Sequence, residues 1–337
     1  MKTNLTDYKG AAKQAGPDVL LGLMRTMLLI RRFEEKIIEV YPVQDMKTPV
    51  HLYIGEEAIA AGVCAHLKKE DYLFTTHRSH GHCLAKGSSP EMLYAEFYGR
   101  STGCSKGKGG SMHPVDPENG ILGTTAIVGG GIPLAAGTAL ASKMKKDGKI
   151  SVTFFGDGAS EEGTFHESLN FASLKQLPVI FICENNSYAT TSPIWQRQPH
   201  DNIAKRASGY NIPGITVDGN SVLEVYEAAG EAVQRARDGR GPTLIECRTY
   251  RWKGHVGPDC DHEKGCRPME DLNKWKERCP VVMFRDFLIN NSVITETQYN
   301  DMLAEIDREM DRSISAARES AMPEKEELLK DVYHITR

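Results

Sequence analysis

Two polar motifs in the middle of the chain are candidates for chemistry, because each follows a run of buried-type residues. Asp157 lies in a Gly-Asp-Gly motif after the run 150–155, and Asn186 ends an Asn-Asn pair after the run 178–183. Carboxylate, amide and main-chain carbonyl oxygens suit Mg²⁺, which often also holds substrate phosphates. The glycines let backbone N–H groups approach an anion at a helix start. Together the motifs predict a magnesium–diphosphate site.

The spacing of these motifs strengthens the prediction. Gly-Asp-Gly alone also makes a good turn and is weak evidence. Here the Asn-Asn pair follows about 28 residues later, which leaves room for one helix between two parallel strands. Both side chains would then lie at the carboxyl ends of those strands, where open α/β sheets bind ligands. The chain contains no G-x-x-x-x-G-K-[ST] motif, and no G-x-G-x-x-G between a strand and a helix.

The elements that must position these motifs alternate between strand and helix. This alternation predicts an α/β fold with a mostly parallel sheet and helices on both faces. We expect helices over 19–40, 55–67, 132–146, 161–174 and 222–237, and strands over 150–155, 178–183, 213–217 and 243–249. The glycine-crowded stretch 99–131 has weak periodicity and is expected to be irregular and functional. We therefore expect an α/β domain over 1–268 and a peripheral, charged helical extension over 269–337.

Composition narrows the class of protein. The net charge of -4 and the lack of a basic block argue against a nucleic-acid partner. No apolar run reaches about 18 residues, which argues against a membrane partner, and the first residues lack the apolar core of a signal peptide. The eight cysteines are scattered without C-x-x-C pairs, which is typical of a reducing compartment. These observations predict a cytoplasmic protein.

Further motifs occur in a recognisable order. They are HLYIGEEA (51–58), HRSHG (77–81), GCSKGKGGSMH (103–113), AIVGGGIPLAAG (126–137) and YRWKGH (250–255). With the Gly-Asp-Gly and Asn-Asn pair, the chain resembles the alpha subunit of the first component of 2-oxo acid dehydrogenase complexes, the pyruvate and acetoin dehydrogenase group, over roughly 20–280. The resemblance implies a thiamine-diphosphate-binding fold over 1–268, thiamine diphosphate and Mg²⁺ as cofactors, and decarboxylation of a 2-oxo acid with acyl transfer to a lipoyl group.

The resemblance also implies how the diphosphate is held. Asp157, Asn186 and the main-chain carbonyl of Tyr188 match the magnesium ligands of the family. Gly158 and Ala159 match residues that present their backbone to the diphosphate. These roles agree with the oxygen-donor site that the two motifs predict by themselves.

The remaining cofactor contacts follow from two other motifs. Arg78 matches the arginine that pairs with the diphosphate as a planar cation. Its neighbour His77 stands where the family usually has Tyr, and is expected at the same cofactor. Ala126 and Val128 match residues whose backbone meets the aminopyrimidine, and Ala126 replaces a usual glycine, so the backbone there must accept a Cβ.

Three histidines are candidates for catalysis. His255 matches the histidine beside the reactive carbon of the cofactor, where it would act as a general acid/base or stabilise charge. His80 and His51 match histidines that line the active-site channel. The alternative for each is an ordinary surface or supporting role, which is commoner for histidines in general.

The sequence departs from the family in several places. The loop after His255 is longer and has lost the serines that mitochondrial relatives phosphorylate. Its Cys260, His262 and Cys266 either ligate a metal or are ordinary loop residues, and the lack of a fourth ligand favours the second. Pro49 and Glu56 replace a common Phe and Gln, which indicates a different donor or acceptor. For the glycine-lysine loop 103–113 we expect a packing role rather than phosphate binding.

The resemblance finally implies a partner. In split family members the Glu that activates the aminopyrimidine comes from a beta subunit, so this chain is expected to be inactive alone and to form a unit of two alpha and two beta chains. A lipoyl acyltransferase and a small 2-oxo acid are the other expected partners. The alternative is a carboligase or transketolase-like subunit that forms C–C bonds in specialised metabolism. A non-enzymatic scaffold is disfavoured because Asp157, Asn186, Arg78 and His255 are all present.

Overall fold

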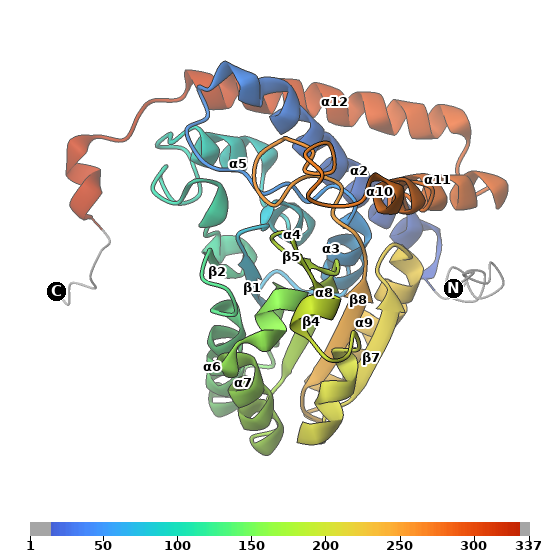
Figure 1. Ribbon diagram of the computed structural model, residues 1–337. Helices are drawn as coiled ribbons and strands as arrows, with labels where there is room; N and C mark the ends of the chain where they lie inside the picture. Colours follow the sequence, from blue (N-terminus) through green and yellow to red (C-terminus); the bar gives the residue numbers. More distant parts are fainter. Residues whose placement is uncertain (1–14, 331–337) are drawn as a thin grey trace.

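A computed structural model describes residues 15–330 of the chain. Its centre is a sheet of six parallel strands in the order β2-β1-β3-β4-β8-β7 (Figure 1). The strands are β1 (Tyr72–Thr76), β2 (Ile121–Thr125), β3 (Ser151–Gly156), β4 (Val179–Asn185), β7 (Gly214–Asp218) and β8 (Thr243–Arg248). Two short antiparallel strands, β5 (Tyr188–Ala189) and β6 (Ser192–Pro193), lie outside this sheet.

Helices connect and cover the strands. They are α2 (Pro17–Val40), α3 (Glu57–Cys64), α4 (His80–Lys86), α5 (Pro90–Phe97), α6 (Gly131–Lys145), α7 (Gly163–Leu174), α8 (Ile194–Arg197), α9 (Val222–Arg237), α10 (Met269–Lys276), α11 (Pro280–Asn290) and α12 (Glu296–Glu319). Local signals set several starts: Pro17 stands in the first turn of α2, and Thr295 and Gln298 form a capping box at α12. Within residues 15–330, no helix combines the length and apolar character needed to cross a bilayer.

The side chains of the strands alternate between two cores. Val152, Phe154 and Ile182 point to the face that α2, α3 and α9 cover, where they join the larger apolar cluster. Phe155 and Phe181 point to the opposite face, which α6 and α7 cover. Successive residues of a strand face opposite sides of a sheet, so a strand buried on both faces is largely apolar rather than alternating. The predicted α/β fold with helices on both faces is confirmed.

The helices after the last strand lie at the periphery, as predicted. In Figure 1, α12 runs beside α2 across the end of the molecule away from α6 and α7. Phe284 of α11 and Ile306, Met310 and Ile314 of α12 are buried in the same apolar cluster as α2. The described helices of the predicted extension therefore share their core with the N-terminal helix, and the proposed boundary at 268 does not separate two cores.

Most predicted elements are present with ends shifted by a few residues. The helix over 222–237 has the predicted bounds, and the helix expected over 161–174 is α7, which begins two residues later, after the 3-10 turn Asp157–Glu161. Two strands of the main sheet, β1 and β2, were not predicted, and neither were the short strands β5 and β6. β1 is a five-residue segment, and β2 lies inside the glycine-crowded stretch 99–131, where its mixed burial leaves no continuous apolar run.

Candidate active site

The candidate site lies where the chain reverses direction across the sheet. From β1 the chain goes to β2 on one side, whereas β3, β4 and β8 follow on the other side. Such a switch point leaves a crevice at the carboxyl ends of the strands, which is the usual ligand site of open α/β sheets. A pocket of about 230 Å³ occupies it. Eleven predicted residues line the pocket: His51, His77, Arg78, Ala126, Val128, Asp157, Gly158, Ala159, Asn186, Tyr188 and His255.

Asp157 and Asn186 meet in this pocket because β3 and β4 are direct neighbours in the sheet. Asp157 is buried, and its carboxylate pairs with the guanidinium of Arg197. Burial raises the pKa of Asp157, and the charge of Arg197 opposes this shift. A buried carboxylate that requires a cation, next to an amide oxygen and the segment of Tyr188, is a donor set that fits Mg²⁺.

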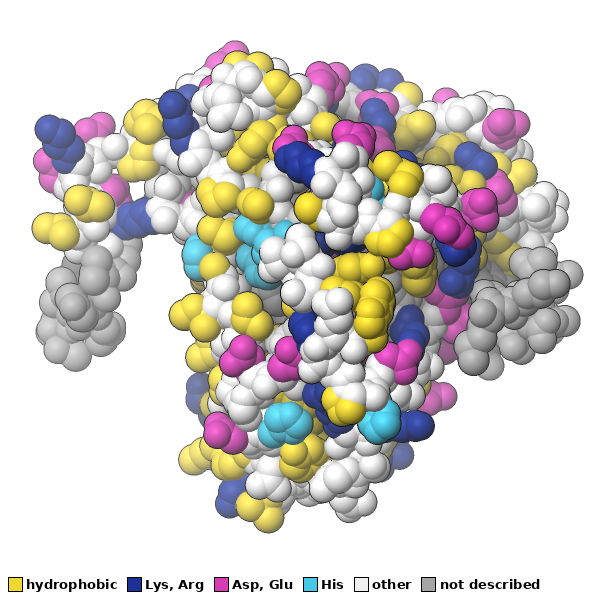
Figure 2. Space-filling view, in the orientation of Figure 1, with side chains coloured by type: hydrophobic (Ala, Val, Ile, Leu, Met, Phe, Trp, Pro, Cys, Tyr) yellow, Lys and Arg dark blue, Asp and Glu magenta, His cyan; other side chains and the backbone are white. Residues whose placement is uncertain are grey.

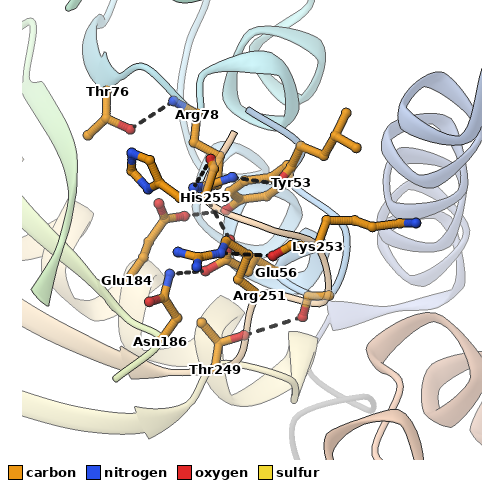
Figure 3. Close-up of polar contacts among 12 residues, drawn as sticks. Tyr53, Glu56, Thr76, Arg78, Glu184, Asn186, Thr249, Arg251, Lys253 and His255 are labelled. Carbon is orange, nitrogen blue, oxygen red and sulfur yellow. Dashed lines mark hydrogen bonds and ion pairs between the residues drawn. The ribbon is translucent and has the colours of Figure 1, made fainter. Parts of the chain in front are cut away.

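Glu56 connects the two ends of the pocket. Its side chain is completely buried, accepts a hydrogen bond from Nδ2 of Asn186 at 3.0 Å, and lies 3.7 Å from Nε of Arg78 (Figure 3). Burial raises the pKa of Glu56 to about 7, although the charge of Arg78 opposes this. Arg78 also donates to the carbonyl oxygens of Leu52 and His255, at 2.8 and 3.3 Å. These contacts fix the guanidinium at the edge of the pocket.

Three histidines gather in the pocket near Arg78. The ring centres of His51 and His77 are 4.5 Å apart, and that of His255 lies 5.2 Å from His51 and 5.1 Å from His77. Burial and the neighbouring charge of Arg78 lower the pKa values to about 3 for His51, about 2 for His77 and about 4 for His255. All three rings are therefore neutral near pH 7.

His80, the remaining predicted catalytic residue, lies outside the lining of the pocket. It is completely buried at the start of α4, and both ring nitrogens have partners. Nδ1 lies 3.1 Å from the carboxylate of Glu34, and Nε2 lies 2.7 Å from the hydroxyl of Ser111. This arrangement suits a residue that holds the wall of the site, because no ring nitrogen is left for a substrate.

The glycine-lysine loop 103–113 wraps around one carboxylate. Glu96 is completely buried, and its two oxygens accept hydrogen bonds from four backbone N–H groups. The donors are Ser105, Gly107, Gly109 and Gly110, at distances of 2.7 to 3.1 Å. At Gly103 a Cβ would lie 2.4 Å from the Glu96 carboxylate. The glycines let the backbone close around this group, which agrees with the expected packing role.

The long loop after His255 is held by Arg267. This arginine is buried and pairs bidentately with Asp261, while Asp259 is exposed and pairs with Lys264. The three loop residues considered as metal ligands, Cys260, His262 and Cys266, do not form a site. His262 forms a hydrogen bond with the hydroxyl of Tyr250 at 3.0 Å. Cys260 lies 3.4 Å from His262, whereas Cys266 is exposed. Cys260, His262 and Cys266 therefore act as ordinary loop residues.

Several pocket residues were not among the predicted site residues. Arg251 is 1% exposed and donates to the carbonyl of Thr190 at 3.0 Å, and burial lowers its pKa to about 9. Glu184 accepts hydrogen bonds from the hydroxyl of Tyr53 and from His82. The sequence carries a signal for both, since Arg251 belongs to the motif YRWKGH and Glu184 directly precedes the Asn-Asn pair. Of the two unusual residues, Glu56 lines the pocket and Pro49 is exposed outside it.

The open side of the pocket is apolar. Ile127, Val128 and Val256 are 75%, 50% and 50% exposed. Figure 2 shows histidine side chains grouped on this face with hydrophobic side chains around them. The φ of Ala126 is negative, so its Cβ fits the backbone without strain. Exposed apolar residues at the rim of a polar pocket are typical of a surface that another chain covers.

Comparison with known proteins agrees with this site. The model of the dehydrogenase E1 component family matches residues 25–326. The chain is 45% identical over 313 residues to the alpha subunit of acetoin:2,6-dichlorophenolindophenol oxidoreductase from Bacillus subtilis, with 93% of each chain covered. It is 40% identical to the subunit of that name from Cupriavidus necator (96% of each), and 38% identical to the pyruvate dehydrogenase E1 alpha subunit of Porphyra purpurea (98% and 94%). The chain therefore belongs to the dehydrogenase E1 component family, as an alpha subunit of the thiamine-diphosphate-dependent 2-oxo acid dehydrogenases.

Proposed function

We propose that the pocket holds thiamine diphosphate through Mg²⁺, with Asp157, Asn186 and the main-chain carbonyl of Tyr188 as metal ligands. The observation that carries this proposal is the meeting of Asp157 and Asn186 at the carboxyl ends of neighbouring strands, in a pocket that also contains Arg78. Arg78 would bind the diphosphate, and the backbone of Gly158 and Ala159 would face it. Ala126 and Val128 would contact the aminopyrimidine through their backbone, with His77 nearby.

The residues of the pocket suggest how this chain takes part in the reaction. When bound, thiamine diphosphate supplies a nucleophilic carbon that attacks the carbonyl of the donor and stabilises negative charge. A neutral His255 ring is able to accept a proton or return one to the acyl unit, and His51 adds a second neutral ring beside it. His80 would position this wall through Glu34 and Ser111.

A beta subunit is the proposed source of the carboxylate that activates the cofactor. The acidic residues that line the pocket are Glu56, Asp157 and Glu184, and each already has partners in this chain. The apolar rim around Ile127 and Val128 offers a surface for that second chain. We therefore propose an enzyme of two alpha and two beta chains, in the cytoplasm, that is inactive when either chain is alone.

The donor is either a 2-oxo acid or a small 2-hydroxy ketone. The first fits the pyruvate dehydrogenase relatives, and the second fits the two relatives named for acetoin, which are 45% and 40% identical. For both donors a lipoyl group on an acyltransferase is the proposed acceptor. The relatives named above do not favour the carboligase alternative.

A direct test uses the chain purified together with its beta-type partner. Turnover of a panel of 2-oxo acids and of acetoin is measured with dichlorophenolindophenol or lipoamide as acceptor, and with an aldehyde as acceptor for carboligation. We expect thiamine-diphosphate- and Mg²⁺-dependent turnover of one donor class only in the presence of both chains. Full turnover by the alpha chain alone would contradict the shared active site, and product formed only with the aldehyde would support carboligation instead.

A further inference from the structure

The three pocket histidines come from separate segments and point their rings at one another. His51 precedes α3, His77 follows β1, and His255 follows β8. One ring nitrogen from each lies within 4.8 Å of the other two, and within residues 15–330 this is the single group of histidine, cysteine or acidic side chains with such a geometry. The rings are inclined by 59°, 83° and 59°, so no pair is stacked.

This arrangement matches three imidazole ligands of one metal ion. A Zn–N bond is about 2.0–2.1 Å, and the centre of an imidazole ring lies about 1 Å beyond its nitrogen, so ring centres on tetrahedral positions are about 5 Å apart. The observed ring-centre distances are 4.5, 5.1 and 5.2 Å. Shifts of less than about 1 Å per ring would bring the three nitrogens to bonding distance from a common point.

The hydrogen bonding of the histidines also supports a metal site. His66, His80, His82 and His262 each have a partner for a ring nitrogen. In the described part of the chain, by contrast, no group donates to or accepts from the rings of the three pocket histidines. His51 is only 6% exposed, and its buried Nδ1 has no hydrogen-bond partner. An unsatisfied nitrogen at this depth is costly unless a ligand completes it.

The electrostatic environment is compatible with a cation. Each of the two nearby arginines has a carboxylate beside it that offsets part of its charge: Glu56 lies 3.7 Å from Arg78, and Asp261 lies 3.5 Å from Arg251. The histidines themselves are neutral near pH 7, since burial lowers their pKa values. A metal ion would therefore find three unprotonated ligands without displacing protons.

We propose that His51, His77 and His255 form a binding site for a borderline transition-metal ion of the Zn²⁺ class, with its fourth position open to the pocket. Nitrogen ligands select such ions, whereas the oxygen donors at Asp157 and Asn186 select Mg²⁺. One pocket thus has two cation sites of different chemistry. In the assembled enzyme, an ion on the histidines occupies the nitrogen of His255 and inhibits turnover; this consequence alone rests on the proposed function.

The binding test uses Co²⁺ as a spectroscopic substitute for Zn²⁺, with the full-length chain freed of any affinity tag. Visible absorption of tetrahedral Co²⁺ is followed during titration, then reversed with Zn²⁺, in excess Mg²⁺. The variants are His51→Gln, His77→Gln and His255→Gln. The controls are His200→Gln, an exposed histidine, and Cys260→Ser/Cys266→Ser, which removes the thiols of the other candidate cluster. Melting temperatures show that each variant is folded.

We expect one Co²⁺ per chain, displaced by Zn²⁺ and unaffected by Mg²⁺, with affinity reduced at least about tenfold in each of the three histidine variants. Both controls should bind as the parent chain does. Absence of bound Co²⁺, binding that survives in the histidine variants, or binding lost in the cysteine variant would each overturn the proposal. With the beta-type chain present, Zn²⁺ should inhibit donor turnover and a chelator should restore it. Because Co²⁺ binding is read without turnover, failure of the proposed function leaves this test intact.

Discussion

Asn186 donates a hydrogen bond from Nδ2 to Oε1 of Glu56 at 3.0 Å, and this contact orients the amide of a proposed metal ligand. Because the amide nitrogen is held by Glu56, the amide oxygen faces the other way. This oxygen accepts a hydrogen bond from the backbone N–H of Tyr188 at 3.3 Å. The carboxylate of Glu56 lies 3.7 Å from Arg78 as well. A residue outside the predicted ligand set thus positions groups for both the metal and the diphosphate.

Two replacements of Glu56 should separate its orientation of the Asn186 amide from the effect of its negative charge. In Glu56→Gln the side-chain oxygen still accepts from Asn186, so Mg²⁺-dependent affinity for thiamine diphosphate should stay within about threefold of the parent value. In Glu56→Ala the amide loses its partner, and affinity should fall by about tenfold or more, the equivalent of one hydrogen bond to a charged group. Calorimetric titration with thiamine diphosphate and Mg²⁺ measures both values. Equal affinities in the two variants would show that Glu56 does not orient Asn186.

The pH dependence of stability offers a second test of Glu56. Burial raises its pKa from 4.5 to about 7, so over this interval the folded chain keeps a proton that the unfolded chain releases. The contribution of Glu56 to the free energy of unfolding therefore falls as the pH rises from about 4.5 to about 7, by about 1–3 kcal/mol. In Glu56→Gln the side chain cannot ionise, so this pH-dependent contribution is absent. Urea unfolding at pH 5 and pH 8 should show the parent losing stability relative to the variant, and a constant difference would contradict the raised pKa.

Asp157 should be indispensable for the metal. Asp157→Asn keeps the size of the side chain but removes the negative charge that attracts Mg²⁺ and now pairs with Arg197. We expect calorimetry to detect no Mg²⁺-dependent binding of thiamine diphosphate to the variant. Addition of Mg²⁺ and thiamine diphosphate together should not raise its melting temperature. Asp201→Asn is a suitable control, because this exposed carboxylate pairs with Arg248 away from the pocket. Binding retained by Asp157→Asn would refute the ligand assignment.

His255 should matter for acyl transfer more than for cofactor binding. His255→Ala is expected to bind thiamine diphosphate almost normally and to lose acyl transfer in the assembled enzyme. Burial and the charge of Arg78 lower the pKa of His255 to about 4, so the ring stays neutral above about pH 5. The acidic limb of the parent kcat profile should therefore lie well below 6.5. An acidic limb of the parent profile near 6.5 would contradict the lowered pKa of His255.

The loop 103–113 should depend on Glu96. Glu96→Gln replaces one of two carboxylate oxygens, which together accept from four backbone N–H groups, with an NH₂ group that cannot accept. We expect a loss of about 3 kcal/mol or more in the free energy of unfolding, because buried donors remain unpaired. Limited proteolysis should cut the variant within the loop. The exposed Glu118→Gln serves as the control, and a stable, resistant Glu96→Gln would show that the carboxylate does not organise the loop.

The sequence by itself predicted the α/β class, four of the six strands of the main sheet, the larger helices that cover it, and twelve site residues, of which eleven line the pocket. These features rest on local patterns: an apolar run buried on both faces predicts a strand, and a polar motif directly after it lies at the end of that strand. β1 and β2 were not predicted, and β2 offers no continuous apolar run because it combines buried with half-buried positions.

Only the tertiary structure decided which distant residues meet. Glu56 and Asn186 are 130 positions apart, and His80 reaches Glu34 across 46. The tertiary structure also brings His77 close to His51 and His255, and it places His80 behind the pocket wall. It places Glu96 where the backbone of the glycine-lysine loop donates hydrogen bonds to it. Periodicity records which face of an element is buried but not which element covers it, so such contacts follow from the packing of the whole chain.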